Sequence, residues 1–248
     1  MLSKSQSKYI QSLHHKKFRD EVACFIAEGD KVILELLKAE KFHCKQVLAL
    51  PEWLHENEAR IRKTYKGEII ELSEIELEKI SALATPNRAV AVFEMAEDKE
   101  MNPKGRLSLA LDEIKDPGNL GTIIRIADWF GIDSIICSHH SVDIYNPKVV
   151  QGTMGSLARV NVIYTDLHEW LQKNESVKKY AAVLNGTSVN EMKIISEGIL
   201  VIGNESNGIH PGILSLADEK ITIPKIGHAE SLNAAVATGI ILSHLVLK

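Results

Sequence analysis

The chain is 248 residues long, 45% of its residues are apolar, and its formal net charge is −4 at pH 7. This length and apolar content suffice for a sizeable buried core, in one large domain or two smaller ones. The net charge argues against a protein that coats nucleic acid without specificity, although it leaves room for a local basic surface.

The cysteines and the apolar runs argue against a disulfide-rich, metal-binding or membrane protein. Cys24, Cys44 and Cys137 are odd in number and lack CxxC spacing, so we expect buried thiols and no metal site. The N-terminus has no apolar leader segment, and the longest apolar run near the C-terminus, broken by Ser243 and His244, is too short to span a bilayer. We therefore expect a soluble, cytoplasmic protein with no membrane association.

Residues 1–20 are more basic than the rest of the chain. They carry Lys4, Lys8, Lys16, Lys17 and Arg19 against a single acidic residue. Two interpretations stay open at this point: the solvated face of an amphipathic helix, or a local surface for RNA phosphates.

A small α/β domain is predicted over residues 1–95. Its apolar patterning alternates between strand and helix, and the expected elements are strands at 23–29, 44–50, 67–72 and 89–95 and helices at 29–40 and 73–84. Residues 96–106 are polar, contain Pro103 and Gly105, and are expected to form a linker.

The second half, residues 107–248, alternates again and carries short apolar strands. They are expected at 107–114, 132–138, 158–164, 180–185, 198–205 and 220–226. Strands that are apolar on both faces and joined by helices predict a parallel sheet covered on both sides. Ligands of such sheets bind beyond the carboxyl ends of the strands.

The sequence VIGNESNGI, residues 201–209, lies at such an end. Gly203 and Gly208 bracket a polar turn, and glycine there allows positive φ or close approach of a ligand to the backbone. A binding loop and a tight turn without a ligand are both compatible with this pattern. The loop has neither the lysine of a P-loop nor the GxGxxG of a dinucleotide site.

A second segment, residues 112–131, turns at Pro117 and Gly118 into a helix for which Asn119 is the expected N-cap. Leu120, Ile123, Ile124, Ala127 and Phe130 keep helical spacing and form the expected core stripe, which leaves Arg125 pointing elsewhere. Arg125 is either an ordinary surface residue or, beside a helix N-terminus, a group suited to a phosphate or a developing anion.

A third segment, ITIPKIGHAESLNAAVATG, ends a strand at Ile223 and Pro224 and is expected to start a helix capped by Ser231. The early turns of that helix are small residues: Ala234, Ala235, Ala237 and Gly239. Small residues allow close packing, and with Ile240, Ile241 and Leu245 they predict a self-complementary surface for a twofold dimer.

Taken together, NLGTIIRIADWFG, LVIGNESNGI and IPKIGHAESLNAAVA resemble in order and spacing the three motifs of the SpoU (TrmH-like) RNA ribose 2′-O-methyltransferases of the SPOUT superfamily. The resemblance covers residues 106–248. More loosely, residues 13–37 resemble the start of the small RNA-binding domain, related to ribosomal protein L30e, that precedes the catalytic domain in many members. Ser206 and Ala234 depart from the usual motif residues but are tolerable variants.

The resemblance implies a fold, a cofactor and an assembly. The fold would be α/β: a C-terminal parallel-sheet domain with a deep trefoil knot at 107–248, preceded by an L30e-like RNA-binding domain at 1–95. S-adenosylmethionine would bind in the knot, and the protein would form a homodimer through the knotted domain. The substrate would be RNA, with ribosomal RNA favoured over tRNA by the L30e-like half.

The resemblance also implies site residues. Gly203, Ile223 and Leu232 would line the cofactor, with Glu205, Ser231 and Asn233 beside it. Arg125, Asn119, Glu205 and Asn233 would form the catalytic group, and Lys16, Lys17 and Arg19 would contact RNA. No metal is expected.

The proposed chemistry assigns Arg125 an electrostatic role. A guanidinium stays protonated in proteins, so Arg125 is expected to hold the adjacent phosphate and stabilise the developing alkoxide, with phosphate or water taking the proton. His228 is an alternative acceptor. Two other functions remain: a noncatalytic RNA-binding protein on the same scaffold, disfavoured by Arg125 and Glu205, and a nucleotide-dependent oxidoreductase, disfavoured by the missing GxGxxG.

Overall fold

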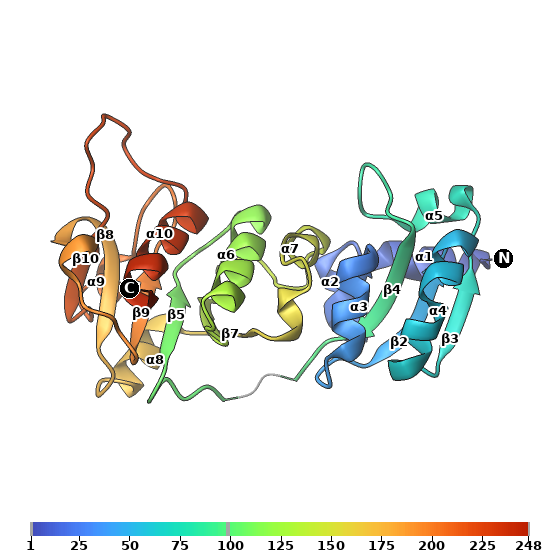
Figure 1. The fold of residues 1–248 in the computed structure, drawn as a ribbon, viewed down its shortest axis with the longest axis horizontal. Helices are drawn as coiled ribbons and strands as arrows, with labels where there is room; N and C mark the ends of the chain where they lie inside the picture. Colours follow the sequence, from blue (N-terminus) through green and yellow to red (C-terminus); the bar gives the residue numbers. More distant parts are fainter. Residues whose placement is uncertain (1, 98–99, 248) are drawn as a thin grey trace. The chain divides into compact units, whose positions relative to one another are not determined.

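The computed structural model describes residues 2–97 and 100–247 (Figure 1). The chain divides into two compact units: Met1–Glu97 with Asp143–Ala158, and Asp98–Val142 with Arg159–Lys248. The first division falls at the predicted linker, of which residues 98–99 lie outside the described residues. Residues 143–158, predicted to belong to the C-terminal domain, pack instead within the N-terminal unit.

The N-terminal unit is built on a four-stranded sheet of order β1-β4-β2-β3, mixed in direction, since β4 runs antiparallel to β1 and β2 while β2 and β3 are parallel. Its strands are β1 (Cys24–Glu28), β2 (Cys44–Ala49), β3 (Glu68–Glu71) and β4 (Ala89–Glu94). All four strands were predicted, because each is a short apolar run ended by polar or turn residues.

The helices of this unit are α1 (Lys4–Ser12), α2 (Lys16–Val22), α3 (Asp30–Lys38), α4 (Pro51–Thr64) and α5 (Glu74–Ile80). The sequence predicted α3 and α5 but not the other three. Helix α4 is mostly polar and buries only Trp53, Asn57 and Ile61, one residue per turn. So narrow a stripe gives a weak periodic signal.

Residues 143–158 complete this unit with α7 (Pro147–Gly152) and the 3₁₀ turn η1 (Ser156–Ala158). The Tyr145 ring lies 4.7 Å from the Phe25 ring of β1, centroid to centroid, and its hydroxyl accepts a 3.0 Å hydrogen bond from the Ala96 N–H. Gly155 has φ +92° and sits against Glu35, so a side chain there would be strained and crowded. The segment is therefore part of the N-terminal core.

The C-terminal unit has the predicted parallel sheet. Six strands follow the order β10-β8-β9-β5-β6-β7, and every neighbouring pair is parallel. They are β5 (Leu107–Leu111), β6 (Ser134–Ser138), β7 (Asn161–Thr165), β8 (Lys179–Ser188), β9 (Gly198–Ile202) and β10 (Glu219–Thr222). Every residue of β5, β6 and β9 is buried, as the two-sided apolar pattern predicted.

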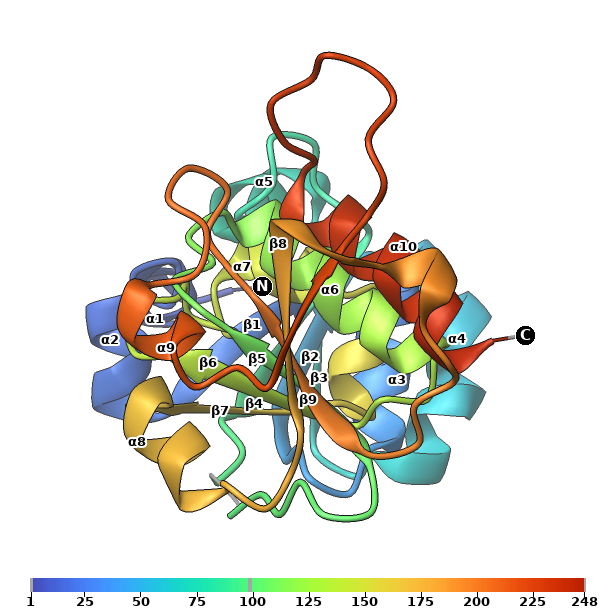
Figure 2. The same cartoon turned by 90° about the vertical axis from the view of Figure 1, so that its left-hand side faces the viewer.

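Helices cover both faces of this sheet, and Figure 2 shows α8 and α9 on one side of the strands and α6 and α10 on the other. The helices are α6 (Pro117–Trp129), α8 (Leu167–Lys173), α9 (Pro211–Leu214) and α10 (Ala234–Val246), with the 3₁₀ turn η2 (Val189–Glu191). No helix within the described part of the chain is long and apolar enough to cross a bilayer.

Both expected helix caps in this unit were wrong. Asp116, not Asn119, caps α6: its carboxylate accepts the Asn119 N–H at 2.8 Å, and Pro117 takes the first helical position. Asn233, not Ser231, caps α10, accepting from the Ala235 and Val236 N–H groups. Each cap lies a few residues from the expected one, which frees Asn119 for other contacts.

The small residues of α10 do not form an exposed stripe, contrary to prediction. Ala234 and Ala235 are buried, as are Ile241 and Leu245. A Cβ added to Gly239 would lie 3.5 Å from the Ile126 Cδ1, so α10 packs against α6 of the same chain. The small residues permit this close packing within the unit.

Candidate active site

Three loops at the carboxyl ends of the C-terminal strands are joined by one chain of hydrogen bonds centred on Asn119. The Asn119 Nδ2 donates to the Glu205 Oε1, and the Asn119 Oδ1 accepts from the Asn233 Nδ2 at 2.7 Å. These residues come from the start of α6, the loop after β9 and the cap of α10. The three segments singled out from the sequence therefore meet at one place.

The same hydrogen bonds fix the orientation of the Asn119 and Asn233 side-chain amides. The Asn233 Oδ1 is occupied by capping α10, which leaves its Nδ2 to donate to Asn119. Asn119 must then present its own Nδ2 to Glu205. Among residues 2–97 and 100–247, the second carboxylate oxygen of Glu205 has no hydrogen-bond partner, so it can accept from a ligand.

Asn204, which the sequence analysis did not single out, shapes the loop after β9. Its Oδ1 accepts from the Ser206 N–H at 2.8 Å and the Asn207 N–H at 3.2 Å, and its Nδ2 donates to the Glu113 carbonyl at 2.8 Å. Its backbone exchanges two hydrogen bonds with Gly208. An asparagine directly after a strand is typical of such a turn and is the signal that could have identified it.

The two glycines of this loop have different roles. A Cβ on Gly203 would lie 2.3 Å from the Gly208 carbonyl carbon, so Gly203 is required by close approach of the loop to itself. Gly208 has φ +68° with nothing within 4 Å of an added Cβ, so it is required by its backbone conformation. Gly203 is thus required by the loop's own backbone, and its predicted contact with the cofactor stays a prediction.

Asp112, at the end of β5, anchors the far end of the same loop. Its buried carboxylate accepts the His210 N–H at 2.7 Å, and its own N–H donates to the Ile202 carbonyl at 2.9 Å. Burial raises the pKa of Asp112, and the hydrogen bond from His210 opposes that shift. Both ends of the loop are therefore tied to β5.

Arg125 is exposed on α6 and is not part of the Asn119 chain. Within the described part of the chain it has no hydrogen bond and no acidic partner, unlike the nearby Arg159, whose guanidinium pairs with Asp128. Thr122 and Trp129, also exposed, share its face of the helix at i−3 and i+4. Its charge is available to an external anion.

The loop between β10 and α10, residues 223–233, extends away from the sheet (Figure 1). Ile223 is half-buried, Ser231 and His228 are exposed, and Leu232 is 46% exposed. Within the described residues, no backbone N–H from Lys225 to Leu232 donates a hydrogen bond. An uncovered apolar side chain beside unused N–H donors fits a ligand with both an apolar ring and polar groups.

The predicted RNA contacts of the N-terminal unit are only partly accessible. Lys16 and Lys17 are exposed, but Arg19 is 1% exposed. Its guanidinium donates to the carbonyls of Leu13 and His14 and forms a 2.5 Å ion pair with Asp143. The prediction that Arg19 contacts RNA phosphate was wrong, because its guanidinium is buried and paired with Asp143 within the unit.

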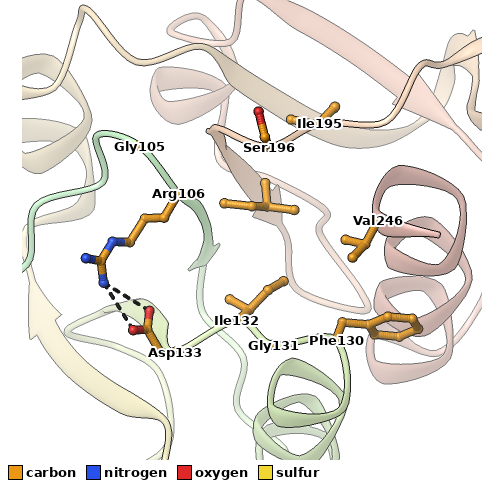
Figure 3. A pocket seen from close by; sticks show the side chains of 10 residues that line it. Gly105, Arg106, Phe130, Gly131, Ile132, Asp133, Ile195, Ser196 and Val246 are labelled. Atoms are coloured by element: carbon orange, nitrogen blue, oxygen red, sulfur yellow. Dashed lines mark hydrogen bonds and ion pairs between the residues drawn. The ribbon is translucent and has the colours of Figure 1, made fainter.

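A cavity of about 400 Å³ lies at the opposite, amino end of the C-terminal sheet (Figure 3). It is bounded by Gly131, Ile195 and Val246, and Arg106 pairs with Asp133 at its edge at 3.1 Å. None of the predicted site residues lines it. The loops joined by Asn119 are therefore the better candidate site, in keeping with the ligand position typical of parallel sheets.

The Asn119 chain can be tested by exchanging donor and acceptor. Asn119→Asp places a carboxylate against Glu205 and should destabilise the protein by about 1–3 kcal/mol, because both groups then only accept. Adding Glu205→Gln restores a donor and should recover most of that loss. Urea unfolding of both single variants and the double variant measures the coupling, and additive effects would show that the two side chains do not interact.

Comparisons with known proteins match both halves of the chain to described families. The SpoU rRNA Methylase family matches residues 106–243, and an MRM3-like substrate binding domain matches residues 4–91. The 23S rRNA (guanosine(2553)-2′-O)-methyltransferase RlmP of Bacillus subtilis is 33% identical over 240 residues, which cover 95% of this chain and 93% of that protein.

Two solved structures have nearly the same fold over the whole chain. The AdoMet-bound rRNA methyltransferase from Sinorhizobium meliloti has a TM-score of 0.86 at 29% identity, covering 99% of this chain and 96% of that one. The SpoU methyltransferase AviRb from Streptomyces viridochromogenes, in complex with AdoMet, has a TM-score of 0.85 at 25% identity, covering 98% and 97%. The chain belongs to the SpoU rRNA methylase family.

Proposed function

We propose that the chain transfers a methyl group from S-adenosylmethionine to the ribose 2′-hydroxyl of a nucleotide in ribosomal RNA. The observation that carries the proposal is the Asn119 chain, which joins three loops beside exposed Arg125, whose guanidinium has no partner within residues 2–97 and 100–247. The named relative acts on 23S rRNA, and both structural neighbours hold the same cofactor.

The loops after β9 and β10 fit this cofactor. Leu232 and Ile223 offer apolar surface for its adenine, and the N–H groups of residues 225–232, which donate to no other described residue, offer donors to its polar groups. Gly203 keeps the first loop closed against itself, while Glu205 and Ser231 lie on the two loops as polar contacts. The bound cofactor would supply an electrophilic methyl group on a sulfonium, a good leaving group.

The protein's own residues then position and polarise the nucleophile. Arg125 would hold the phosphate next to the target ribose and stabilise charge as the 2′-hydroxyl becomes an alkoxide. Asn119 and Asn233 act as positioning residues, since their amides are already hydrogen-bonded to each other and to Glu205. The proton would pass to phosphate or water, with the exposed His228 as the alternative acceptor.

Three further properties belong to the proposal. The loops at 203–209 and 223–233 would form the trefoil knot of the resembled family, supported by the shared fold of the structural neighbours. Exposed Lys16 and Lys17 would contact RNA phosphate from the N-terminal unit. The location would be the cytoplasm, since three free, buried cysteines suit a reducing compartment.

We also propose a homodimer through the C-terminal unit, by a surface different from the one first predicted. Trp129 at the end of α6 is 83% exposed, Val236 is exposed near the start of α10, which packs against α6, and Leu247 is exposed directly after α10. Exposed large apolar side chains on adjacent helices are typical of an interface. A second copy related by a twofold would cover them.

Light scattering should therefore report a mass about twice the 27.5 kDa of the chain. Trp129→Glu should shift the protein towards the monomer, because a charge replaces a large apolar contact. Ile75→Glu, at an exposed apolar position on α5, is the matched control and should leave the mass unchanged. A monomeric natural chain would refute the dimer.

Removing residues 1–95 would be a poor test of this assembly. Residues 143–158 pack within the N-terminal unit, so the deletion would expose their buried side chains, Ile144, Val149, Val150 and Leu157. The truncated chain should aggregate through these residues. Substitutions in the full chain avoid that outcome.

The function itself is tested by incubating the protein with methyl-tritiated S-adenosylmethionine and, separately, ribosomal RNA and tRNA. We expect label in ribosomal RNA, at a nucleotide that becomes resistant to alkaline cleavage on its 3′ side. Label in tRNA alone would redirect the substrate. No label in either, with RNA still bound, would favour the noncatalytic RNA-binding protein.

A further inference from the structure

Helix α2 presents an aromatic and basic surface that the proposed mechanism does not use. Phe18 is 41% exposed, and its ring lies 6.5 Å from that of exposed His15, at an interplanar angle of 67°. Lys17, also exposed, has no ion pair or hydrogen bond within the described residues, whereas Lys16 is paired with Asp20 at 2.6 Å. We call His15, Lys17 and Phe18 the α2 patch.

The α2 patch stands on a rigid support. Arg19, the next residue after Phe18, has its guanidinium buried and held by two carbonyls and by Asp143. The helix ends at Ala23 in the left-handed conformation and passes directly into the fully buried β1. Phe18 is therefore exposed on an anchored element, so a ligand would bind a preformed surface at little conformational cost.

We propose that the α2 patch binds an unpaired nucleotide of the RNA substrate, with the base stacked on the Phe18 ring, the His15 ring against the edge of that base, and a neighbouring phosphate paired with Lys17. This inference rests on the proposed function, because it presupposes an RNA substrate. Aromatic rings beside unpaired cations are the usual means of holding single-stranded RNA. The match of residues 4–91 to a substrate binding domain supports such a role for this unit.

Substitutions of Phe18 in the full chain separate stacking from apolar contact. Phe18→Leu keeps an apolar side chain but removes the aromatic face, and should weaken binding of a 23S rRNA transcript by roughly 5- to 150-fold. Phe18→Trp keeps the aromatic face and should retain natural affinity. Lys17→Ala should lower the salt slope of binding by about 0.7, the value for one single-strand phosphate. Ile75→Leu, at the 65% exposed Ile75, is the control.

Each outcome either supports or contradicts nucleotide binding by the α2 patch. Loss with Phe18→Leu and retention with Phe18→Trp support the α2 patch. Unchanged affinity in Phe18→Leu would overturn it, as would a change of mass in light scattering, which would assign the surface to a protein partner. Phe18→Leu should raise KM for RNA with kcat and cofactor affinity unchanged, whereas failure of the proposed function would appear as absent methyl transfer by the natural chain.

Discussion

Arg125→Ala is expected to reduce methyl transfer by about 10²-fold or more while leaving S-adenosylmethionine affinity near its natural value. Arg125 is exposed on α6, lies outside the Asn119 chain and has no partner within the described residues. Its removal should therefore cost neither folding nor the cofactor loops. What is lost is the charge that would meet the phosphate and the developing alkoxide.

Two comparisons make that experiment decisive. Arg106→Ala removes another exposed arginine of the same unit, at the start of β5 and paired with Asp133, and should change the rate little. Arg125→Lys keeps the charge but not the planar fork, and should recover only part of the rate. Single-turnover rates with saturating RNA, beside calorimetry with the cofactor, give both quantities. Turnover retained in Arg125→Ala would move the role to another residue.

The central strands of both sheets could be predicted because their residues are almost all buried, which requires an apolar sequence. Runs such as Leu107–Leu111 and Gly198–Ile202 are buried on both faces, so their apolar content is unbroken. Helices α1 and α4 lack that signal, since each buries few residues and is otherwise solvated. Their stability comes from tertiary contacts and, in α1, from the Ser3 capping box, and hydrophobic periodicity shows neither.

Tertiary contacts also explain the errors in detail. Ser231 and Asn119 are good capping residues, and only the path of the chain decides that Asn233 and Asp116 take those places. The small residues of α10 predicted close packing correctly but not its partner, which is Ile126 of α6 in the same chain. Arg19 looked like part of a basic surface because Asp143, its partner, is distant in sequence.

In the candidate site, too, some residues could be predicted from the sequence and others could not. The motif resemblance identified Asn119, Glu205 and Asn233 from their order along the chain, and the structure places them in contact. Asn204 and Asp112 were missed, because they act on backbone groups of loops whose shape the sequence does not give. The side chains that hold the loops in place are therefore Asn204 and Asp112, which lie near the motif residues in sequence and are not the predicted site residues themselves.

Gly203→Ala should lower S-adenosylmethionine affinity by at least about 10-fold, because a Cβ there would lie 2.3 Å from the Gly208 carbonyl carbon and must push the loop open. The obstacle is backbone, which cannot rotate away as a side chain could. Gly203→Val, with more bulk, should lose binding altogether. Calorimetry measures the affinity, and circular dichroism shows whether the fold survives.

Substitutions at two other glycines distinguish the backbone clash at Gly203 from the strain of an alanine at positive φ. Gly208→Ala meets no atom within 4 Å but keeps φ +68°, so it should cost about 1–2 kcal/mol of loop stability and weaken the cofactor less than Gly203→Ala does. Gly105→Ala, with φ +73° and equally open space, lies at the other end of β5 and should leave cofactor affinity unchanged. Equal losses in all three variants would mean that the loop after β9 has no special part in holding the cofactor, because strain alone would then account for the effect.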